Sequence, residues 1–234
     1  MWKRLQLNQG IPNFNWFRMK KALNVSEQIQ RDGRVDLLKW IALITMIIDH
    51  IGIVFFPDEA IYRVIGRIAF PIFIILLAEG AVRTRNKKAH LIRLWVFACI
   101  SQIPYLLLID PYVLNVIFTM AIAVTCIRLP YLIPVVFIGL MIIPVDYSWY
   151  GVGLALIYYY LRKWPGIACI LAVNLTFLYA IQIGSFIQFW AVIGLVLPLI
   201  IRKVSFRIPN TSKYFFYWFY PVHLAILFII SKVY

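Results

Sequence analysis

Long apolar segments recur along almost the whole of this sequence. Nine of them, separated by short turns, approach or reach the length that a helix needs to cross a bilayer, about 20 residues. Nine such segments in 234 residues leave no room for a sizeable soluble domain. The expected spans are 37–56, 61–82, 92–109, 112–127, 129–145, 149–161, 165–181, 186–201 and 214–231.

The composition agrees with this interpretation. Apolar residues make up 63% of the chain and charged residues only 14%, whereas about a quarter of a soluble domain is charged. The sequence therefore predicts an all-α, polytopic integral membrane protein with about nine transmembrane helices. Residues 36–234 form the expected membrane domain. Residues 1–35 form a basic cytoplasmic segment, in which 13–23 is either a helix lying on the membrane surface or an unstructured tail.

The positive charges predict an orientation. The net charge of +14 would suggest nucleic acid in a soluble protein, but here we attribute it to cytoplasmic loops and expect no nucleic-acid partner. With the N-terminus inside and the C-terminus outside, the inner segments hold all but four of the 23 lysines and arginines. The outer loops then carry acidic residues, namely Asp58, Glu59, Asp110 and Asp146.

The three cysteines, Cys99, Cys126 and Cys169, all lie within apolar segments. Small apolar packing is the usual role of cysteine in such a position. We therefore expect neither disulfides nor a metal site.

Ionisable residues inside a membrane span are costly and mark functional sites by default. Counted at a helical rise of about 1.5 Å per residue, they fall on two levels. The expected inner level holds Lys39 and Glu79, and the expected middle-to-outer level holds Asp49, His50, Arg67 and His223, with Arg63 nearer the outer surface.

Asp49 and His50 are adjacent in an apolar helix, so their side chains point about 100° apart. We therefore expect Asp49 to hold Arg67 and His50 to face a cavity. Purely structural roles stay open for the others: Arg67 neutralising Asp49, His223 as a core histidine, and Glu79 paired with Lys39 or Arg83.

Prolines also favour a cavity, because they free backbone carbonyls that must find partners or line a polar space. Pro71 lies one turn beyond Arg67, Pro104 follows a Ser-Gln pair, and Pro221 precedes His223 by two residues. Four polar residues at outer span ends either mark boundaries or shape an outer vestibule: Asn115, Asp146, Tyr147 and Tyr150.

Several of these segments together resemble the TraX family of small bacterial membrane proteins. They are LKWIALITMIIDHIG, IGRIAFPIFIILLAEGAVRTRN, RLWVFACISQIPY and LNVIFT, from about Leu38 to Thr119, with a looser similarity at FYWFYPVHL. The ten residues between Lys39 and His50 also resemble the basic-residue and histidine signature of the acyltransferase-three family, which has arginine at the first position. The closing helix with Tyr217, Tyr220 and His223 is similar to that family as well.

The resemblance implies a multi-pass acetyltransferase of the bacterial cytoplasmic membrane. Acetyl-coenzyme A would bind from inside, at Lys39, Glu79, Arg83, Arg85, Lys87 and Arg93, since lysine and arginine suit phosphates. His50 would act as general base or as transient acyl carrier, with Asp49, Arg67 and His223 in support. The family precedent for the acceptor is a pilin amine; a glycan hydroxyl or a small molecule fits equally.

Two other functions remain open at this stage. A proton-coupled transporter would use Asp49, His50, Arg67 and Glu79 as a relay. In a membrane scaffold without enzymatic activity, the buried charges would only determine how the helices pack.

Overall fold

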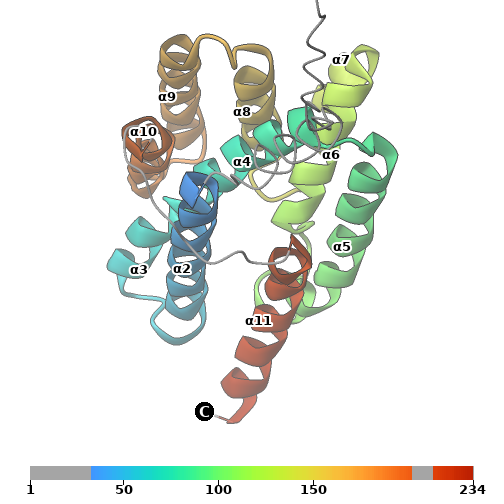
Figure 1. The fold of residues 1–234 in the computed structure, drawn as a ribbon. Helices are drawn as coiled ribbons and strands as arrows, with labels where there is room; N and C mark the ends of the chain where they lie inside the picture. The colour runs from blue at the N-terminus through green and yellow to red at the C-terminus, as the bar shows by residue number, and fades with distance from the viewer. Residues whose placement is uncertain (1–32, 202–212, 234) are drawn as a thin grey trace, which may run out of the picture. The chain divides into compact units, whose positions relative to one another are not determined.

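The computed structural model describes residues 33–201 and 213–233. Throughout these residues the regular structure is helical, as the sequence predicts, apart from one isolated bridge between Leu114 and Val145. The helices, labelled as in Figure 1, are α2 Gly33–Phe55, α3 Ala60–Gly66, α4 Ala69–Arg83, α5 Lys87–Leu108, α6 Val116–Arg128, η1 Pro130–Leu132, α7 Ile133–Ile142, α8 Ser148–Tyr160, α9 Pro165–Gln182, η2 Phe186–Trp190, α10 Ala191–Ile201 and α11 Lys213–Val233.

Five described segments are long and apolar enough to cross a membrane: Gly33–Phe55, Ala60–Arg83, Lys87–Leu108, Pro165–Gln182 and Tyr214–Val233. A sixth span is possible if α6 and the following helix count together, although they are bent by 119°. Helices occur in all nine predicted segments, but α8 has 13 residues, which is short for a full crossing. The helix positions are therefore confirmed, whereas the nine crossings and the orientation stay predictions. The proposed surface helix at 13–23 lies outside the described residues.

The second predicted span is interrupted between α3 and α4. Pro71 is the third residue of α4 and has no backbone N–H to donate to the carbonyl of Arg67, one turn earlier. Arg67 and Ile68 instead form a turn between the two helices. Both residues keep right-handed helical backbone angles, and Ala60–Arg83 still counts as one segment of membrane-spanning length.

Helix α4 lies at the centre of the packing. It contacts α2, α6, α8 and α10, while α11 packs against α5 and α2 (Figure 1). Nine residues of α4 are buried, Ala69, Phe70, Pro71, Ile72, Ile74, Ile75, Leu77, Ala78 and Ala81. Arg67, just before α4, and Arg83, its last residue, therefore lie at opposite ends of this central helix.

Candidate functional site: a buried charge network and two adjoining cavities

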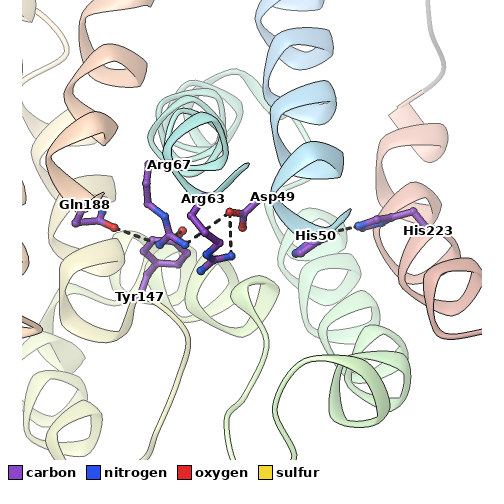
Figure 2. A network of polar contacts seen from close by, with 7 residues as sticks. All are labelled: Asp49, His50, Arg63, Arg67, Tyr147, Gln188 and His223. Carbon is purple, nitrogen blue, oxygen red and sulfur yellow. Dashed lines mark hydrogen bonds and ion pairs between the residues drawn. The ribbon is translucent and has the colours of Figure 1, made fainter. Parts of the chain in front are cut away.

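Asp49 forms ion pairs with two arginines. Its Oδ1 lies 2.9 Å from a guanidinium nitrogen of Arg63 and 3.8 Å from one of Arg67. The expected pair with Arg67 is present, but Arg63 is the closer partner (Figure 2). Arg63 and Arg67 are four residues apart and so share one helix face. Arg63, expected nearer the outer surface, is the more exposed of the two arginines at 31% against 13%, and its long side chain still reaches the carboxylate.

Gly66 allows this approach of α2 and α3. A β-carbon at position 66 would overlap the carboxylate of Asp49. The side chain of Asp49 therefore occupies space that any residue other than glycine would fill, and the backbone at Gly66 forms part of its binding site.

Arg67 extends the network toward α8 and η2. It donates to Tyr147 Oη at 3.1 Å and to Gln188 Oε1 at 3.3 Å. Tyr147 has a left-handed backbone, with φ of 57°, which is uncommon for a residue other than glycine. This conformation places its ring 3.6 Å from that of Phe70, centroid to centroid, in a stack. The strained residue is thus held by packing and by the guanidinium together.

His50 faces away from the arginines and meets His223 of α11. His50 Nδ1 and His223 Nε2 are 2.7 Å apart, and the two rings lie edge to edge with centroids 4.9 Å apart and planes inclined by 24° (Figure 2). Asp49 and His50 thus take different partners, as the 100° between adjacent helical residues predicts. His223, for which the sequence left a core role open, is in direct contact with His50.

A small cavity of about 60 Å³ adjoins both parts of this network. Asp49, His50, Asp146 and Tyr147 line it together with Tyr220 and apolar side chains. Asp146 lies in the loop before α8, where burial raises the pKa of its carboxyl to about 6 although Arg67 and Arg63 lower it. Two of the expected outer boundary residues, Asp146 and Tyr147, therefore line a cavity beside His50.

A larger cavity of about 410 Å³ adjoins the first. Its walls are mostly apolar, and three residues with basic side chains are among those that line it: Lys39, His90 and Arg93. The two cavities have five lining residues in common, Met46, Phe73, Val116, Met120 and Tyr220. The cavity lined by Lys39 and Arg93 is thus separated from the space beside His50 only by these shared side chains.

The two residues of the predicted inner level, Lys39 and Glu79, have different ion-pair partners. Lys39 pairs with Asp36 at 2.9 Å, and Glu79 pairs with Arg83 at 3.3 Å. Of the two partners left open for Glu79, the structure selects Arg83. Four of the six expected cofactor residues do not line the larger cavity: Glu79, Arg83, Arg85 and Lys87. Of these, Arg83, Arg85 and Lys87 are exposed.

Some residues of the site had little signal in the sequence. Gln188 lies in η2, where an isolated amide in an aromatic segment does not stand out, yet it is 1% exposed and accepts from Arg67. Asp36 lies beside the basic N-terminal segment, where a carboxylate at i and a lysine at i+3 could have indicated the pair with Lys39. In the part of the chain that the structure describes, no three His, Cys, Asp or Glu side chains are grouped to hold a metal.

The helices and the site define a class: a multi-pass, all-helical membrane protein with a buried ionisable centre and an adjoining apolar cavity. Within this class the chain belongs to the TraX family, because the family model described as TraX protein matches residues 34–231.

Individual relatives agree with this assignment. A probable fimbrial assembly protein FimC, serogroup H1, of Dichelobacter nodosus is 31% identical over 81% of this chain and 92% of its own length. Protein TraX of Escherichia coli is 33% identical over 39% of this chain and 38% of its own length. A Rickettsia prowazekii protein, uncharacterized protein RP591, is 58% identical over 16% of this chain and 15% of its own. No solved structure matches the chain.

Proposed function

We propose that this protein is a membrane-embedded acetyltransferase, which moves an acetyl group from acetyl-coenzyme A to an amine or hydroxyl acceptor. One observation carries the proposal: the larger cavity is lined by Lys39 and Arg93 and shares Tyr220 and four other wall residues with the cavity beside His50. A donor with an anionic head, a long arm and a reactive end needs such an arrangement.

The donor matches the cavity in charge and in length. The phosphates of coenzyme A pair with Lys39 and Arg93, since ammonium and guanidinium groups bind phosphate strongly. Lys39 and His50 are eleven residues apart on α2, which is about 16 Å along the helix axis. An extended pantetheine arm covers a comparable distance along the apolar walls. The thioester then lies beside His50, and the cationic part of the cavity faces the cytoplasm, as the distribution of charges predicts.

His50 supplies the acid–base chemistry. A neutral imidazole accepts the proton of the acceptor amine or hydroxyl as the nitrogen or oxygen attacks the thioester carbonyl. The carbon–sulfur bond then breaks, and the same proton passes to the sulfur. The products are the acetylated acceptor and coenzyme A, so protons balance. In the two-step alternative, the imidazole itself takes the acetyl group before the acceptor does.

The relatives suggest the acceptor. One is named a probable fimbrial assembly protein, and the TraX resemblance implies acetylation of a pilin amine. We therefore propose the N-terminal amine of a pilus or fimbrial subunit, presented on the outer side of the bacterial inner membrane. A glycan hydroxyl and a small molecule are the other acceptors to compare.

The transporter alternative has less support than acetyl transfer. Glu79 lies twelve residues beyond Arg67, which corresponds to about 18 Å of helix, and it pairs with Arg83. Asp49 is held by Arg63 and Arg67. Only three of the four proposed relay groups are therefore close together.

The test uses purified full-length protein in detergent. Acetyl-coenzyme A should raise its melting temperature in proportion to the logarithm of ligand concentration above Kd. Deuterium-labelled acetyl groups should appear by mass spectrometry on a pilin N-terminal peptide. His50→Ala should retain the thermal shift and lose transfer. Ile44→Ala, at an exposed position of the same helix, should retain both.

Two results would contradict the proposal. One is a melting temperature unaffected by acetyl-coenzyme A, together with no transfer to any of the three acceptor classes. The other is transfer by His50→Ala at the rate of the unaltered protein. Folded yield, measured for each variant by gel filtration, separates loss of chemistry from loss of structure.

A further inference from the structure

The hydrogen bond between His50 and His223 determines which nitrogen of His50 is available for chemistry. We infer that His223 is a positioning residue, which holds His50 in the tautomer protonated at Nδ1 and so leaves the Nε2 lone pair free beside the smaller cavity. The tautomer follows from contacts within the protein. Its importance for acetyl transfer rests on the proposed function.

The first step concerns His223. Its Nδ1 lies 2.9 Å from the backbone carbonyl oxygen of Phe219. A carbonyl oxygen only accepts hydrogen bonds. His223 Nδ1 must therefore carry a hydrogen and donate it.

The second step concerns the contact between the rings. A neutral imidazole has one N–H and one acceptor nitrogen. With its hydrogen on Nδ1, neutral His223 presents an acceptor at Nε2. His50 Nδ1, 2.7 Å away, must then be the donor, which leaves the hydrogen-free Nε2 of His50 as the second ring nitrogen.

In the opposite arrangement, His223 Nε2 would donate to His50 Nδ1. His223 would then carry a hydrogen on both ring nitrogens and be a charged imidazolium. That ring is 7% exposed, and no carboxylate forms an ion pair with it in residues 33–201 and 213–233. Burying a positive charge without a countercharge is costly, and Arg63 and Arg67 already add two on the other side of His50. The neutral pair is therefore the favoured state.

Neighbouring groups hold both rings in place. His223 stacks on Phe219 with centroids 5.2 Å apart, and Tyr220 meets the edge of His50 at 6.1 Å. Asp49, the carboxylate adjacent in sequence, does not perform this function because it is bound to Arg63 and Arg67. A histidine backed by a main-chain carbonyl thus takes the place that a carboxylate occupies behind many catalytic histidines.

The pair also suits a transient proton. When His50 Nε2 accepts a proton from the acceptor, its Nδ1 proton can move across the 2.7 Å contact to His223 Nε2. The Phe219 carbonyl still accepts from His223 Nδ1. The proton returns along the same path when the thiolate of coenzyme A takes the proton on Nε2, so the pair ends as it began.

Histidine tautomers are observed directly by nitrogen-15 NMR of the full-length protein labelled at histidine. The chain has three histidines, and His90→Gln, His50→Ala and His223→Gln assign the signals. We expect both His50 and His223 in the Nδ1–H form. His223→Gln should keep His50 in that form, because the glutamine Oε1 can accept where His223 Nε2 does. His223→Phe should release His50 toward the Nε2–H form.

Acetyl transfer gives the second measurement. His223→Phe should lower kcat by about 100-fold, a loss typical of misplacing a reacting group, with KM for acetyl-coenzyme A within a few-fold. His223→Gln should recover part of that loss. Val222→Ala, an exposed neighbour on α11, should behave like the unaltered protein.

The outcomes separate the two proposals. An Nε2–H tautomer at His50 in the unaltered protein overturns the inference whatever the activity. Normal kcat in His223→Phe with His50 in the Nε2–H form also overturns it, while acetyl transfer stands. Absence of transfer in every variant and in the unaltered protein overturns the proposed function, and the NMR spectra still determine the tautomer. If His223→Phe does not fold, the unaltered protein and His223→Gln decide the tautomer.

Discussion

Arg63 is the nearest cation to Asp49, with its guanidinium nitrogen 2.9 Å from the carboxylate Oδ1. Arg67, one turn further on, is 3.8 Å from the same oxygen. One carboxylate thus serves two guanidinium groups. The second of these is also held by Tyr147 and Gln188.

This arrangement predicts an order of stabilities. Asp49→Asn removes the carboxylate that pairs with both guanidinium groups and should lower the melting temperature more than Arg63→Gln, which leaves Asp49 with Arg67. Arg63 is 31% exposed, so we expect a loss for Asp49→Asn between the ~1 kcal/mol of surface pairs and the ~3–5 kcal/mol of buried ones. The double variant that combines Asp49→Asn with Arg63→Gln should recover part of the lost stability. Strictly additive losses would show that the pair is not coupled.

Gly66→Ala should displace the carboxylate of Asp49. The added methyl group overlaps Asp49, and overpacking of this kind costs about 1–3 kcal/mol. Gly139→Ala in α7 is the matched control, because no atom lies within 4 Å of a β-carbon there. That substitution should be neutral or stabilise the helix by up to about 1 kcal/mol. Equal melting temperatures for the two variants would contradict the close packing at Gly66.

The cationic part of the larger cavity should dominate affinity for acetyl-coenzyme A. Arg93 lines that cavity, whereas Arg85, in the connection before α5, does not. Loss of one hydrogen bond to a charged phosphate, ~1.5–3 kcal/mol, corresponds to about 10- to 100-fold in Kd. We expect that loss for Arg93→Gln and little change for Arg85→Gln, both measured by calorimetric titration. An equal loss of affinity in both variants would indicate that the basic residues between α4 and α5 bind the cofactor as well.

A bulky residue at the shared wall of the cavities should block the path to His50. Met120 lines both cavities, and Met120→Trp fills the space between them. We expect acetyl transfer to fall at least tenfold, or acetyl-coenzyme A to bind more weakly. Met141→Trp, at a position 75% exposed, is the same substitution away from the cavities and should leave both unchanged. Normal transfer by Met120→Trp would place the donor elsewhere.

Asp146 predicts a pH dependence of stability. Burial raises the pKa of its carboxyl from 3.8 to about 6 in the folded protein. Because the folded-state pKa is above the unfolded one, the group contributes stability that is full below about pH 4 and is lost as the pH rises through 6. The melting temperature of the unaltered protein should therefore fall relative to Asp146→Asn between pH 4 and 7. A constant difference between the two curves would contradict the raised pKa.

Much of the architecture follows from the sequence alone. Apolar segments bounded by charges determine where helices begin and end, because backbone groups inside a membrane must bond within their own helix. The 100° step between Asp49 and His50 sends the two side chains to different partners. The residues of the TraX resemblance place His50, Arg67 and His223 among the candidates.

Tertiary structure decided the partners. The absence of a side chain at Gly66 lets the Asp49 carboxylate approach α3, where both Arg63 and Arg67 reach it. Gln188 meets Arg67 across 121 residues of chain, and His223 meets His50 across 173. Periodicity within one helix carries no information about which other helix lies alongside. That choice depends on how all the apolar faces pack together, and here it produced the pairing of His50 with His223.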